Sequence, residues 1–497
     1  MSARDELPER WARTTVAHAA SAPVVYGILQ PGPDRPDGIP YVRPTEIQND
    51  IIQVADLRRT SKKIAEKYHR SSLEASDIIL SIVGTIGKVA LVPPELIGAN
   101  ITQSSARIRL PREFILPRFG AYALRSPLLV NQFNVARLGT AVPRLNLAHV
   151  RDLLLPVAPL GEQHRIVEAI ESYFTRLDDA VATLERVQRN LKRYRASVLK
   201  AAVEGRLVPT EASVARAEGR DYEPASVLLD RILAERRRRW EEAELAKMKA
   251  KGKTPKDGKW KAKYMEPVAP ETEELPELPE GWCWASPGQF FSWSSGDFLP
   301  KTAQRGGPVP VIGGNGVNGS HDEPLVTTPT IVVGRVGAHC GNIHLTDGPV
   351  WITDNAIYAS EGCDLSVLPY WRMVMSMQNL NANAGGTGQP YVNQKHLNDL
   401  VIPLAPEAEQ QRIVQETERL DSLTNRVHDD TRSSAERCGR LRQSILKWAF
   451  EGRLADQDPT DEPASRLLER IRAEREAKPA QPSRTRRRAR TTTKDRT

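Results

Sequence analysis

The chain has 497 residues and four cysteines without CxxC spacing, which allows about three or four domain-sized units and argues against a disulfide framework. Its net charge of +8 is concentrated: residues 478–497 hold eight Lys or Arg and one Asp, so the rest is nearly neutral and overall charge is no argument for nucleic-acid binding. The charged beginning argues against a signal peptide, and no apolar run is long enough to cross a membrane. We expect a cytoplasmic protein.

Residues 1–155 have mixed, β-like character. The apolar run 77–83 ends in Gly84-Thr-Ile-Gly87-Lys88 and is followed by the short apolar run 89–92. Short apolar runs separated by glycine turns are typical of strands and hairpins. The pattern predicts that this segment forms a domain containing a sheet.

Residues 156–208 have the pattern of one long helix. Steps of four and three residues separate its apolar positions, the heptad signature of a coiled coil. These positions are Ile166, Ile170, Tyr173, Leu177, Ala180, Leu184, Val187, Leu191, Tyr194 and Val198. Gly205 is suited to end the helix. A helix over 162–203 would be about 60 Å long, which suits a spacer better than a core element.

Residues 209–277 form a basic insert and linker. Four arginines stand at 236–239, and spaced lysines follow from Lys247 to Lys263 before a segment rich in Pro and Glu. One interpretation is a solvated helix followed by a linker. The other is a contact to nucleic-acid phosphate or to a partner subunit.

The second half repeats this order. Residues 278–402 contain the apolar run 331–337, which leads to Gly341-Asn342-Ile343. Residues 403–457 predict a second long helix, and 458–497 predict a short helix and a disordered basic tail around 484–490. The heptad of the second helix keeps Ile413, Leu420, Val427, Leu441 and Ile445 but also carries Thr417, Thr424, Thr431, Ser434 and Cys438. Because so polar a seam would make a weak homodimer, we expect it to pack against the first helix in the same chain.

Three repeated blocks show that the two halves are related. Residues 156–167 return at 403–414, residues 197–207 return at 444–454 with the same offset, and residues 223–236 return at 462–475. The edges of the mixed segments also match: 7–11 parallels 278–282, and 140–153 parallels 387–400. Between those edges the sequences diverge. A period this long indicates a duplicated domain pair, and similar frames around different interiors indicate one fold with two specificities.

Residues for catalysis are hard to find. Gly84-Thr-Ile-Gly87-Lys88 is too short for a phosphate-binding loop, and there is no cofactor fingerprint and no Asn/Asp-Pro-Pro-aromatic tetrapeptide of the adenine methyltransferase kind. His339, Cys340 and His344 resemble part of a metal site, but no matching ligand pair follows, so we favour a polar loop facing solvent or DNA. We expect no catalytic site and no metal site.

The ordered motifs resemble the specificity subunit of type I restriction-modification systems. The motifs are Pro-x-x-Pro-x-x-Glu-Gln-x-x-Ile-Val at the head of each helix, Glu-Gly-Arg-Leu at its end, Glu-Pro-Ala-Ser after it, and Leu278-Pro-Glu-Gly-Trp282 before the second variable segment. They cover nearly the whole chain. The basic insert and the Arg-rich tail depart from the family pattern and leave partner geometry open.

The resemblance implies an α+β fold with two mixed α/β target-recognition domains separated by two long antiparallel coiled-coil helices in a pseudo-two-fold arrangement. On this basis residues 1–155 and 278–402 are the recognition domains, and 156–208 and 403–457 are the helices. The resemblance further implies a non-catalytic subunit that binds double-stranded DNA and recruits two modification subunits and restriction subunits. S-adenosylmethionine, ATP and Mg would bind those partners and not this chain.

The family offers no fixed set of base-reading residues, so DNA contacts are chosen by chemistry. The candidates stand in or near glycine-marked loops, with side chains suited to base edges or phosphate: Lys88, Gln103, Arg335, Asn342 and Asn355. Each could instead be a solvated surface residue. The candidates for helix pairing or partner contact are Glu162, Gln163, Arg165, Ile166, Leu184, Leu191, Glu409, Gln410, Arg412, Ile413, Leu441 and Ile445.

Three other interpretations stay open. The chain could be a stand-alone methyltransferase or restriction enzyme, although the missing cofactor motif counts against it. It could be a coiled-coil scaffold without a nucleic-acid role, although the divergent segments inside shared frames count against that. It could also serve a modification-only system or another phage-defence complex, which the residues do not separate from restriction.

Overall fold

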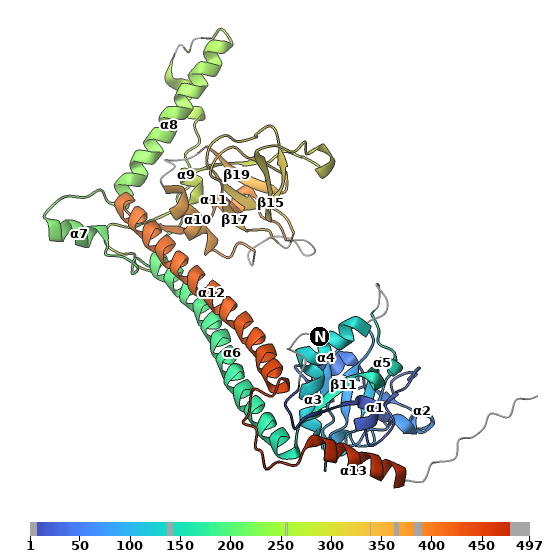
Figure 1. Cartoon of the computed structure of the whole chain (residues 1–497). Helices are drawn as coiled ribbons and strands as arrows, with labels where there is room; N and C mark the ends of the chain where they lie inside the picture. The colour runs from blue at the N-terminus through green and yellow to red at the C-terminus, as the bar shows by residue number, and fades with distance from the viewer. Residues whose placement is uncertain are drawn as a thin grey trace, which may run out of the picture. The chain divides into compact units, whose positions relative to one another are not determined.

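The computed structural model describes residues 7–136, 143–253, 255, 257–337, 339–361, 367–381 and 390–477. Contacts divide the chain into two units, Met1–Glu185 with Arg432–Thr497 and Arg186–Thr431, and the division falls inside the two long helices labelled α6 and α12 in Figure 1. None of the helices in the described ranges has the length and apolar character that a membrane span requires. The predicted tail around 484–490 lies outside the described residues.

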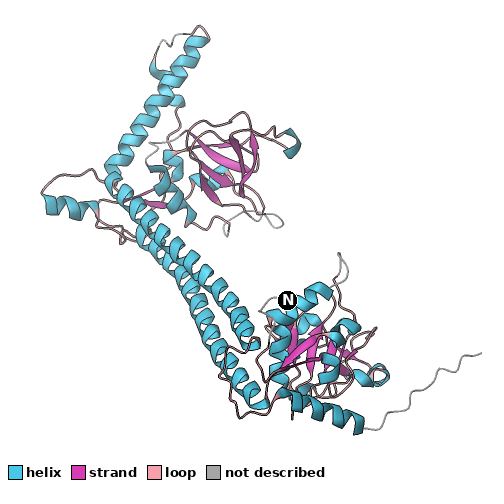
Figure 2. Cartoon of the chain, in the orientation of Figure 1, coloured by secondary structure: helices cyan, strands magenta, loops and turns pink. Residues whose placement is uncertain are grey.

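Unit 1 contains a domain that we call the first α/β domain, residues 7–157 (Figure 2). Its main sheet is antiparallel, in the order β2 (Val25–Tyr26), β10 (Ser105–Ile108), β7 (Ile78–Ser81) and β8 (Val89–Leu91). A second sheet has the order β6 (Arg59–Thr60), β3 (Ile39–Val42) and β9 (Asn100–Ile101). Every residue of β7 and β10 is buried, which explains why the run at 77–83 is so apolar.

Helices and a terminal strand pair complete this domain. Helices α3 (Pro117–Arg125) and α4 (Pro127–Ala136) pack on each other, and α3 contacts β8. Strands β1 (Ala12–Thr15) and β11 (Leu154–Val157) pair, so the two edges of the segment come together. The shared edges noted in the sequence are therefore the points where the variable interior joins the rest of the protein.

Unit 2 contains a domain with the same strand plan, the second α/β domain, residues 282–404. Its main sheet has the order β13 (Ser292–Ser295), β19 (Ala356–Glu361), β16 (Ile331–Gly334) and β17 (Ile343–Leu345). Strand β14 (Val309–Gly313) pairs with β15 (Gly316–His321) and with β18 (Trp351–Ile352), and β12 (Cys283–Ala285) pairs with β20 (Ile402–Leu404). Helix α10 (Leu368–Ser376) contacts β17 and β20. The prediction of two mixed α/β segments is confirmed.

The two long helices are α6 (Leu160–Val203) and α12 (Glu407–Phe450), each of 44 residues. In unit 2, Gln188 bonds Thr431 at 3.4 Å and Arg195 bonds Thr424 at 3.0 Å, so the paired segments run in opposite directions. In unit 1, Arg442 of α12 pairs with Asp178 and lies over the Phe174 ring of α6. Each unit therefore contains a stretch of both helices in contact.

One stripe of α12 is buried. Its members recur every seven residues and are Thr417, Thr424, Thr431, Cys438 and Ile445, each less than 10% exposed. Val427 and Leu441, which we expected on the same seam, are 41% and 44% exposed. The helix pair therefore buries the stripe that carries the threonines, and these two positions of the other stripe stay exposed. The expectation for Leu441 is corrected accordingly.

Three shorter helices follow the long ones along the chain, two after α6 and one after α12. Helix α7 (Glu211–Glu218) starts at its N-cap Thr210 and ends at Gly219, whose φ of 68° suits a residue without a side chain. Helix α8 (Ala225–Ala250) forms the basic insert and is followed by the 3-10 turn Gly258–Lys263. Helix α13 (Ala464–Ala477) packs on α1 (Val16–Ala19) and β1 in unit 1 (Figure 1).

Candidate nucleic-acid interface

The second domain brings its three candidate DNA contacts to one end of the main sheet. The Gly334 N–H donates to the Asn342 carbonyl at 2.8 Å, and the Arg335 N–H donates to the Asn355 carbonyl at 2.9 Å. The side chains of Arg335, Asn342 and Asn355 are all exposed there. We call this set the second edge.

Glycines shape the second edge. A Cβ on Gly334 would lie 2.4 Å from the His339 carbonyl oxygen, and a Cβ on Gly314 would lie 3.3 Å from the Gly334 Cα. Gly341 has a φ of 81°, in the left-handed region that favours glycine. The loops after β14 and β16 pack so closely that residues larger than glycine would not fit at these positions, and the polar side chains beside them are exposed.

The first domain has an equivalent edge at the end of β7. The Ser81 N–H donates to the Lys88 carbonyl at 2.9 Å, and the Ile82 N–H donates to the Ser104 carbonyl at 2.8 Å. These bonds repeat the pair at Gly334 and Arg335, so Lys88 occupies the position of Asn342, and Ser104 that of Asn355. We call Lys88, Gln103 and Ser104 the first edge.

The first edge borders a depression of about 500 Å³ that Lys88 and Gln103 both line. Gln103 is exposed, but the Lys88 ammonium donates to the Pro44 carbonyl at 2.9 Å and the Ile47 carbonyl at 2.8 Å. An ammonium has three donors, so at most one is left for a ligand. The main role of Lys88 is therefore to join two loops of its own domain, and DNA contact is at most a second role.

Two further residues at these edges escaped the sequence analysis. Arg144 forms an isolated bridge with Val83, and Tyr391 forms the matching bridge with Val336. Both are exposed, and each directly follows the proline of a shared frame, Pro143 or Pro390. The sequence did contain a signal for these two residues: each differs between the halves and stands directly beside a proline that matches.

Each edge also carries an exposed apolar side chain. Ile28 bridges Thr102 in the first domain as Asp297 bridges Thr353 in the second, which makes Leu29 and Phe298 equivalent. Leu29 is 53% exposed and Phe298 is 73% exposed. Apolar side chains at such positions can contact a thymine methyl group or wedge between base steps.

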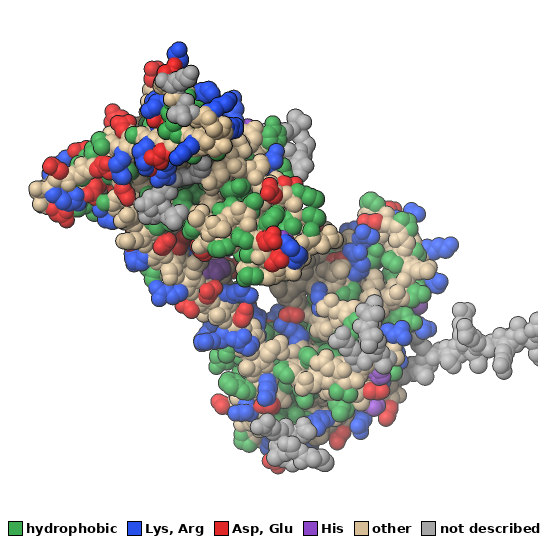
Figure 3. All heavy atoms as spheres, turned by 90° about the horizontal axis from the view of Figure 1, so that it is seen from above, with side chains coloured by type: hydrophobic (Ala, Val, Ile, Leu, Met, Phe, Trp, Pro, Cys, Tyr) green, Lys and Arg blue, Asp and Glu red, His purple; other side chains and the backbone are tan. Residues whose placement is uncertain are grey.

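Together these side chains suit base-edge contacts. Arginine pairs with guanine, and asparagine and glutamine pair with adenine in the major groove. The second edge offers Arg335, Asn342 and Asn355. The first edge offers Gln103, Ser104 and the neighbouring Arg144, because the Lys88 ammonium already bonds two carbonyls. On the face seen in Figure 3, basic and acidic side chains are interspersed. Among the described residues this face therefore shows no broad basic surface for DNA, and the local edges are the better candidates for DNA contact.

The possible metal site at the second edge is not supported in the described part of the chain. His339 is exposed, whereas Cys340 is fully buried and its carbonyl accepts a bond from the Asn381 amide at 3.0 Å. The expectation that this loop faces outward is therefore wrong for Cys340. The described residues contain no group of three or more His, Cys, Asp and Glu side chains able to hold a metal ion.

The residues at the head of each long helix anchor that helix to its domain. The Trp11 indole donates to Glu162 at 3.0 Å, and the Trp282 indole donates to Glu409 at 3.1 Å. Burial raises the pKa of both carboxyls, although the indole bonds act to lower it. The same contact therefore joins domain and helix in both units.

Gln163 and Gln410 continue this anchor. The Gln163 amide donates to the Ala158 and Phe114 carbonyls at 2.9 and 3.1 Å, and its oxygen accepts the Leu116 N–H at 2.8 Å. Gln410 donates to the equivalent Ala405 carbonyl at 2.8 Å. Both side chains are buried, so they do not offer a free surface to a partner.

The remaining helix candidates divide by burial. Arg165 pairs with Asp461 at 2.7 Å and Arg412 pairs with Glu211 at 2.7 Å, each within its own unit. Ile166 and Ile413 are fully buried in the domain cores, and Ile445 is buried. Leu184 and Leu191 are half-buried, and Leu441 is exposed.

Comparison with known proteins identifies both halves. The family described as the type I restriction modification DNA specificity domain matches residues 33–187 and again residues 279–437. The two matches together cover more than half of the chain, and each includes one edge and part of one long helix.

Individual relatives agree. The chain is 31% identical to the EcoBI specificity subunit of Escherichia coli over 46% of its length and 49% of that protein, and 24% identical to the EcoKI specificity subunit of Escherichia coli strain K12 over 95% of its length and 97% of that protein. A chain solved in a study of type I R-M complex assembly and conformational transition is 20% identical, with a TM-score of 0.56 over 90% of this chain and 99% of that one. This last likeness shows the fold.

Proposed function

Because the chain belongs to the type I restriction-modification DNA specificity family, and is therefore a DNA-recognition subunit and not a catalytic one, we propose that it reads a bipartite, asymmetric double-stranded DNA target. Residues 1–155 and 278–402 serve as the two recognition domains, each reading one half-site. One observation carries the proposal: equivalent backbone positions hold different residues in the two domains, Lys88 (its ammonium bonded within the domain) and Ser104 in the first but the exposed Asn342 and Asn355 in the second. Different side chains on one scaffold suit different base sequences.

We further propose that the paired helices act as an antiparallel coiled-coil ruler between the half-sites. Each helix is anchored to a domain by a buried Trp–Glu bond and a buried glutamine. A rigid helix anchored in this way transmits its length to the spacing of the domains, so the DNA between the half-sites is left unread.

The same helices are proposed to recruit the partner subunits. Several apolar side chains that the helix pairing leaves uncovered are between about a third and a half exposed, namely Tyr173, Tyr194, Leu423, Val427, Leu441 and Trp448. Exposed apolar groups at helical spacing are suited to packing against further helices. Two modification subunits with S-adenosylmethionine, and restriction subunits with ATP and Mg, are the partners and cofactors that the proposal expects, acting in the cytoplasm.

A specificity subunit of a modification-only or other phage-defence complex is the second candidate. The DNA edges and the helices would serve that complex equally well. Purifying the chain from its native cell and identifying the proteins that accompany it distinguishes the two candidates, because the first requires restriction subunits beside the modification subunits and the second does not.

The test of modular recognition is an exchange of one domain. Replacing residues 12–153 by the matching segment of a relative keeps the Trp11 anchor and the β11 junction. Methylation-site sequencing of the complex should then show that one half of the target changes and the other does not. The reciprocal exchange of residues 283–400 is the control. A change in both halves, or in neither, would contradict the proposal.

The ruler is tested by lengthening α6 and α12 by one heptad each. Seven residues preserve the seam and add about 10 Å, the length of about three base pairs. The unread spacer should grow by one to about three base pairs, with weaker binding because the added pairs also rotate one half-site. Four-residue insertions, which break the register, are the control. An unchanged spacer with intact methylation would show that something else sets the distance.

A further inference from the structure

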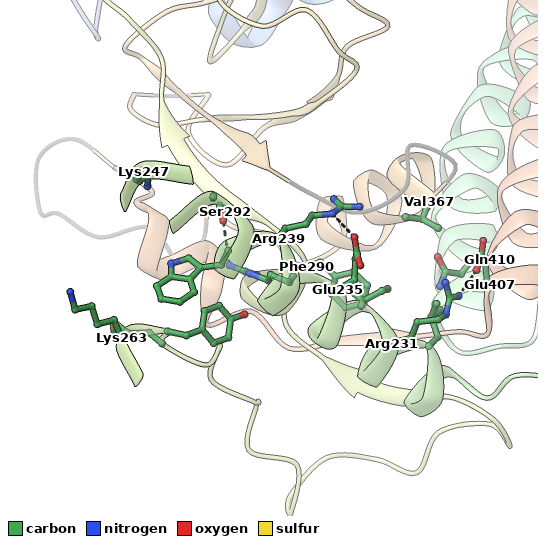
Figure 4. Close-up of a pocket in the computed structure, with 17 residues that line it drawn as sticks. Arg231, Glu235, Arg239, Lys247, Lys263, Phe290, Ser292, Val367, Glu407 and Gln410 are labelled. Carbon is green, nitrogen blue, oxygen red and sulfur yellow. Dashed lines mark hydrogen bonds and ion pairs between the residues drawn. The ribbon is translucent and has the colours of Figure 1, made fainter. Parts of the chain in front are cut away.

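Unit 2 contains a cavity of about 900 Å³ that the DNA edges do not use (Figure 4). Helix α8 and the segment that follows it form one side, with Trp240, Lys247, Lys263 and Tyr264. The second domain supplies Phe290, Ser292 and Val367, and the first turn of α12 supplies Glu407 and Gln410. The cavity thus lies at the junction of the basic insert, the domain and the long helix.

Specific contacts hold the walls of this cavity in place. The Trp240 ring stacks on Trp260 with centroids 6.2 Å apart and meets Tyr264 at 5.3 Å, so the segment 258–265 folds back on α8. Lys261 pairs with Glu241 at 2.7 Å across the same two elements. The Arg236 guanidinium donates to the Gly288 carbonyl at 2.6 Å, which fixes α8 to the second domain.

The repeat in the sequence does not extend over the whole insert that forms this cavity. The third repeated block relates residues 223–236 to 462–475. Seven cavity-lining residues of the insert come after this block: Arg239, Trp240, Ala243, Lys247, Lys263, Tyr264 and Met265. The insert therefore adds to one half of a duplicated chain a site that the duplication itself does not explain.

A buried acceptor in the cavity is short of a donor. Gln410 lines the cavity, is 1% exposed, and its side-chain oxygen has no hydrogen-bond partner among the described residues. In unit 1 the oxygen of the equivalent Gln163 accepts the backbone N–H of Leu116 at 2.8 Å. The buried Tyr264 hydroxyl likewise has no partner within the described ranges. In unit 1 a backbone N–H therefore fills the place that no described residue fills beside the Gln410 oxygen.

The charges in the cavity select for an acidic ligand. Five basic and two acidic side chains line it. Glu407 is used by Arg231 at 3.2 Å and Glu235 by Arg239 at 2.8 Å, which neutralises both acids. Lys263 has no acidic partner among the described residues, and it lies with Lys247 at the opposite end from Gln410 in Figure 4.

We propose that this cavity is a docking site for an acidic peptide segment of a partner protein. An apolar side chain of the peptide packs among Trp240, Tyr264 and Phe290, a backbone N–H meets Gln410, and carboxylates lie beside Lys247 and Lys263. DNA is the less fitting occupant, because Leu228, Ile232 and Val367 make much of the wall apolar. The proposal is independent of how the chain reads DNA.

The test selects peptides from a random displayed library on the full chain, with counter-selection on the double variant Lys247→Glu with Lys263→Glu. Both lysines are exposed, so the variant should fold. The enriched peptides should combine Asp or Glu with an aromatic or large aliphatic residue. In fluorescence anisotropy the double variant should bind them at least tenfold more weakly. Lys249→Glu with Lys259→Glu makes the same charge change on exposed residues outside the cavity and should alter binding less than twofold.

Three outcomes would overturn the proposal. They are the absence of any enriched peptide, enrichment of basic or purely polar peptides, and equal weakening by both double variants. Binding of a random DNA duplex that only the Lys247→Glu with Lys263→Glu variant loses would assign the cavity to phosphate instead. Methylation by the reconstituted complex is measured in parallel. Because methylation does not depend on the peptide, it shows whether DNA recognition fails independently of peptide docking.

Discussion

The first and second edges place different residues on the same backbone positions, and they use them differently. The backbone carbonyls of Lys88 and Asn342 both accept an N–H of the preceding strand, yet the Lys88 ammonium donates to Pro44 and Ile47, whereas the Asn342 side chain is exposed. The Lys88 ammonium joins two loop carbonyls beside the depression, whereas close contacts of Gly314 and Gly334 shape the loops of the second edge. The two copies of the fold therefore share backbone positions, but the side chains at those positions have different roles.

The helix anchors teach the same lesson with smaller differences. Gln163 makes three backbone hydrogen bonds in unit 1, and the structure gives Gln410 one in unit 2. The Trp–Glu bond is present in both. Both units thus use the same type of anchor, and the anchor of unit 1 has more hydrogen bonds between helix and domain.

The largest effect is expected from removing the glutamines. Gln163→Leu leaves three buried or partly buried backbone groups unpaired, at about 1–3 kcal/mol each, so unit 1 should lose about 3–9 kcal/mol. Gln410→Leu leaves only the Ala405 carbonyl unpaired and should cost unit 2 about 1–3 kcal/mol. Hydrogen exchange resolved by unit measures both. Equal losses would mean that the two anchors are equivalent after all.

The next test separates the tasks of Lys88 and Asn342. Lys88→Met leaves two carbonyls without their donor and should destabilise the first domain by about 1–3 kcal/mol. Asn342→Ala should change the stability of the second domain by less than about 0.5 kcal/mol while weakening DNA binding. Thermal unfolding and a mobility shift on the target duplex check both variants. Destabilisation by Asn342→Ala would give it a structural task too.

Arg335 should affect base discrimination and not folding. Arg335→Ala removes an exposed guanidinium, so a half-site read by the second domain should lose about 1–3 kcal/mol of discrimination at one base pair. Sequencing of methylated sites should show relaxation in that half only. Arg372→Ala, an exposed arginine on α10, is the matched control. Uniform weakening across all sequences would instead make Arg335 a phosphate contact.

The smallest effect is a pH dependence at the anchor. Burial raises the pKa of the Glu162 carboxyl, so its contribution to stability is full below the unfolded pKa and is lost as the pH rises through the folded pKa. Glu162→Gln keeps an acceptor for Trp11 and removes this slope, which should be worth about 1 kcal/mol or less. Glu409→Gln should change the slope less, because Glu409 also accepts the Glu211 N–H at 2.8 Å. The measurement is the free energy of unfolding at several pH values for the wild-type chain and both variants. If wild type and Glu162→Gln had the same pH dependence, the prediction would be wrong.

Much of the architecture followed from repetition and periodicity. The heptad predicted helices over 162–203 and from 409, and the structure has Leu160–Val203 and Glu407–Phe450. The apolar run at 331–337 predicted a strand, and the structure has β16 at Ile331–Gly334. These features are local, because burial of one face imposes a period on the chain whatever it packs against.

Which heptad stripe is buried could not be predicted from the sequence. The heptad placed Val427 and Leu441 on the same seam as Thr417, Thr424 and Thr431, but Val427 and Leu441 are exposed and the stripe with the threonines is the buried one. Small residues let two helices approach closely, and the choice depends on the partner helix. The grouping of Arg335, Asn342 and Asn355 likewise required the strand pairing, since 20 residues separate the first from the last.

The sequence by itself determined the duplication, the two long helices, the family and the places where the halves differ, because these depend on period and on residue identity along the chain. Only the tertiary structure decided what individual polar residues do. It turned Lys88 inward to two carbonyls, buried Glu162 and Gln163 in the anchor, and closed the insert over a cavity. A polar side chain takes its role from the groups that meet it in space, and those groups lie far away in the sequence.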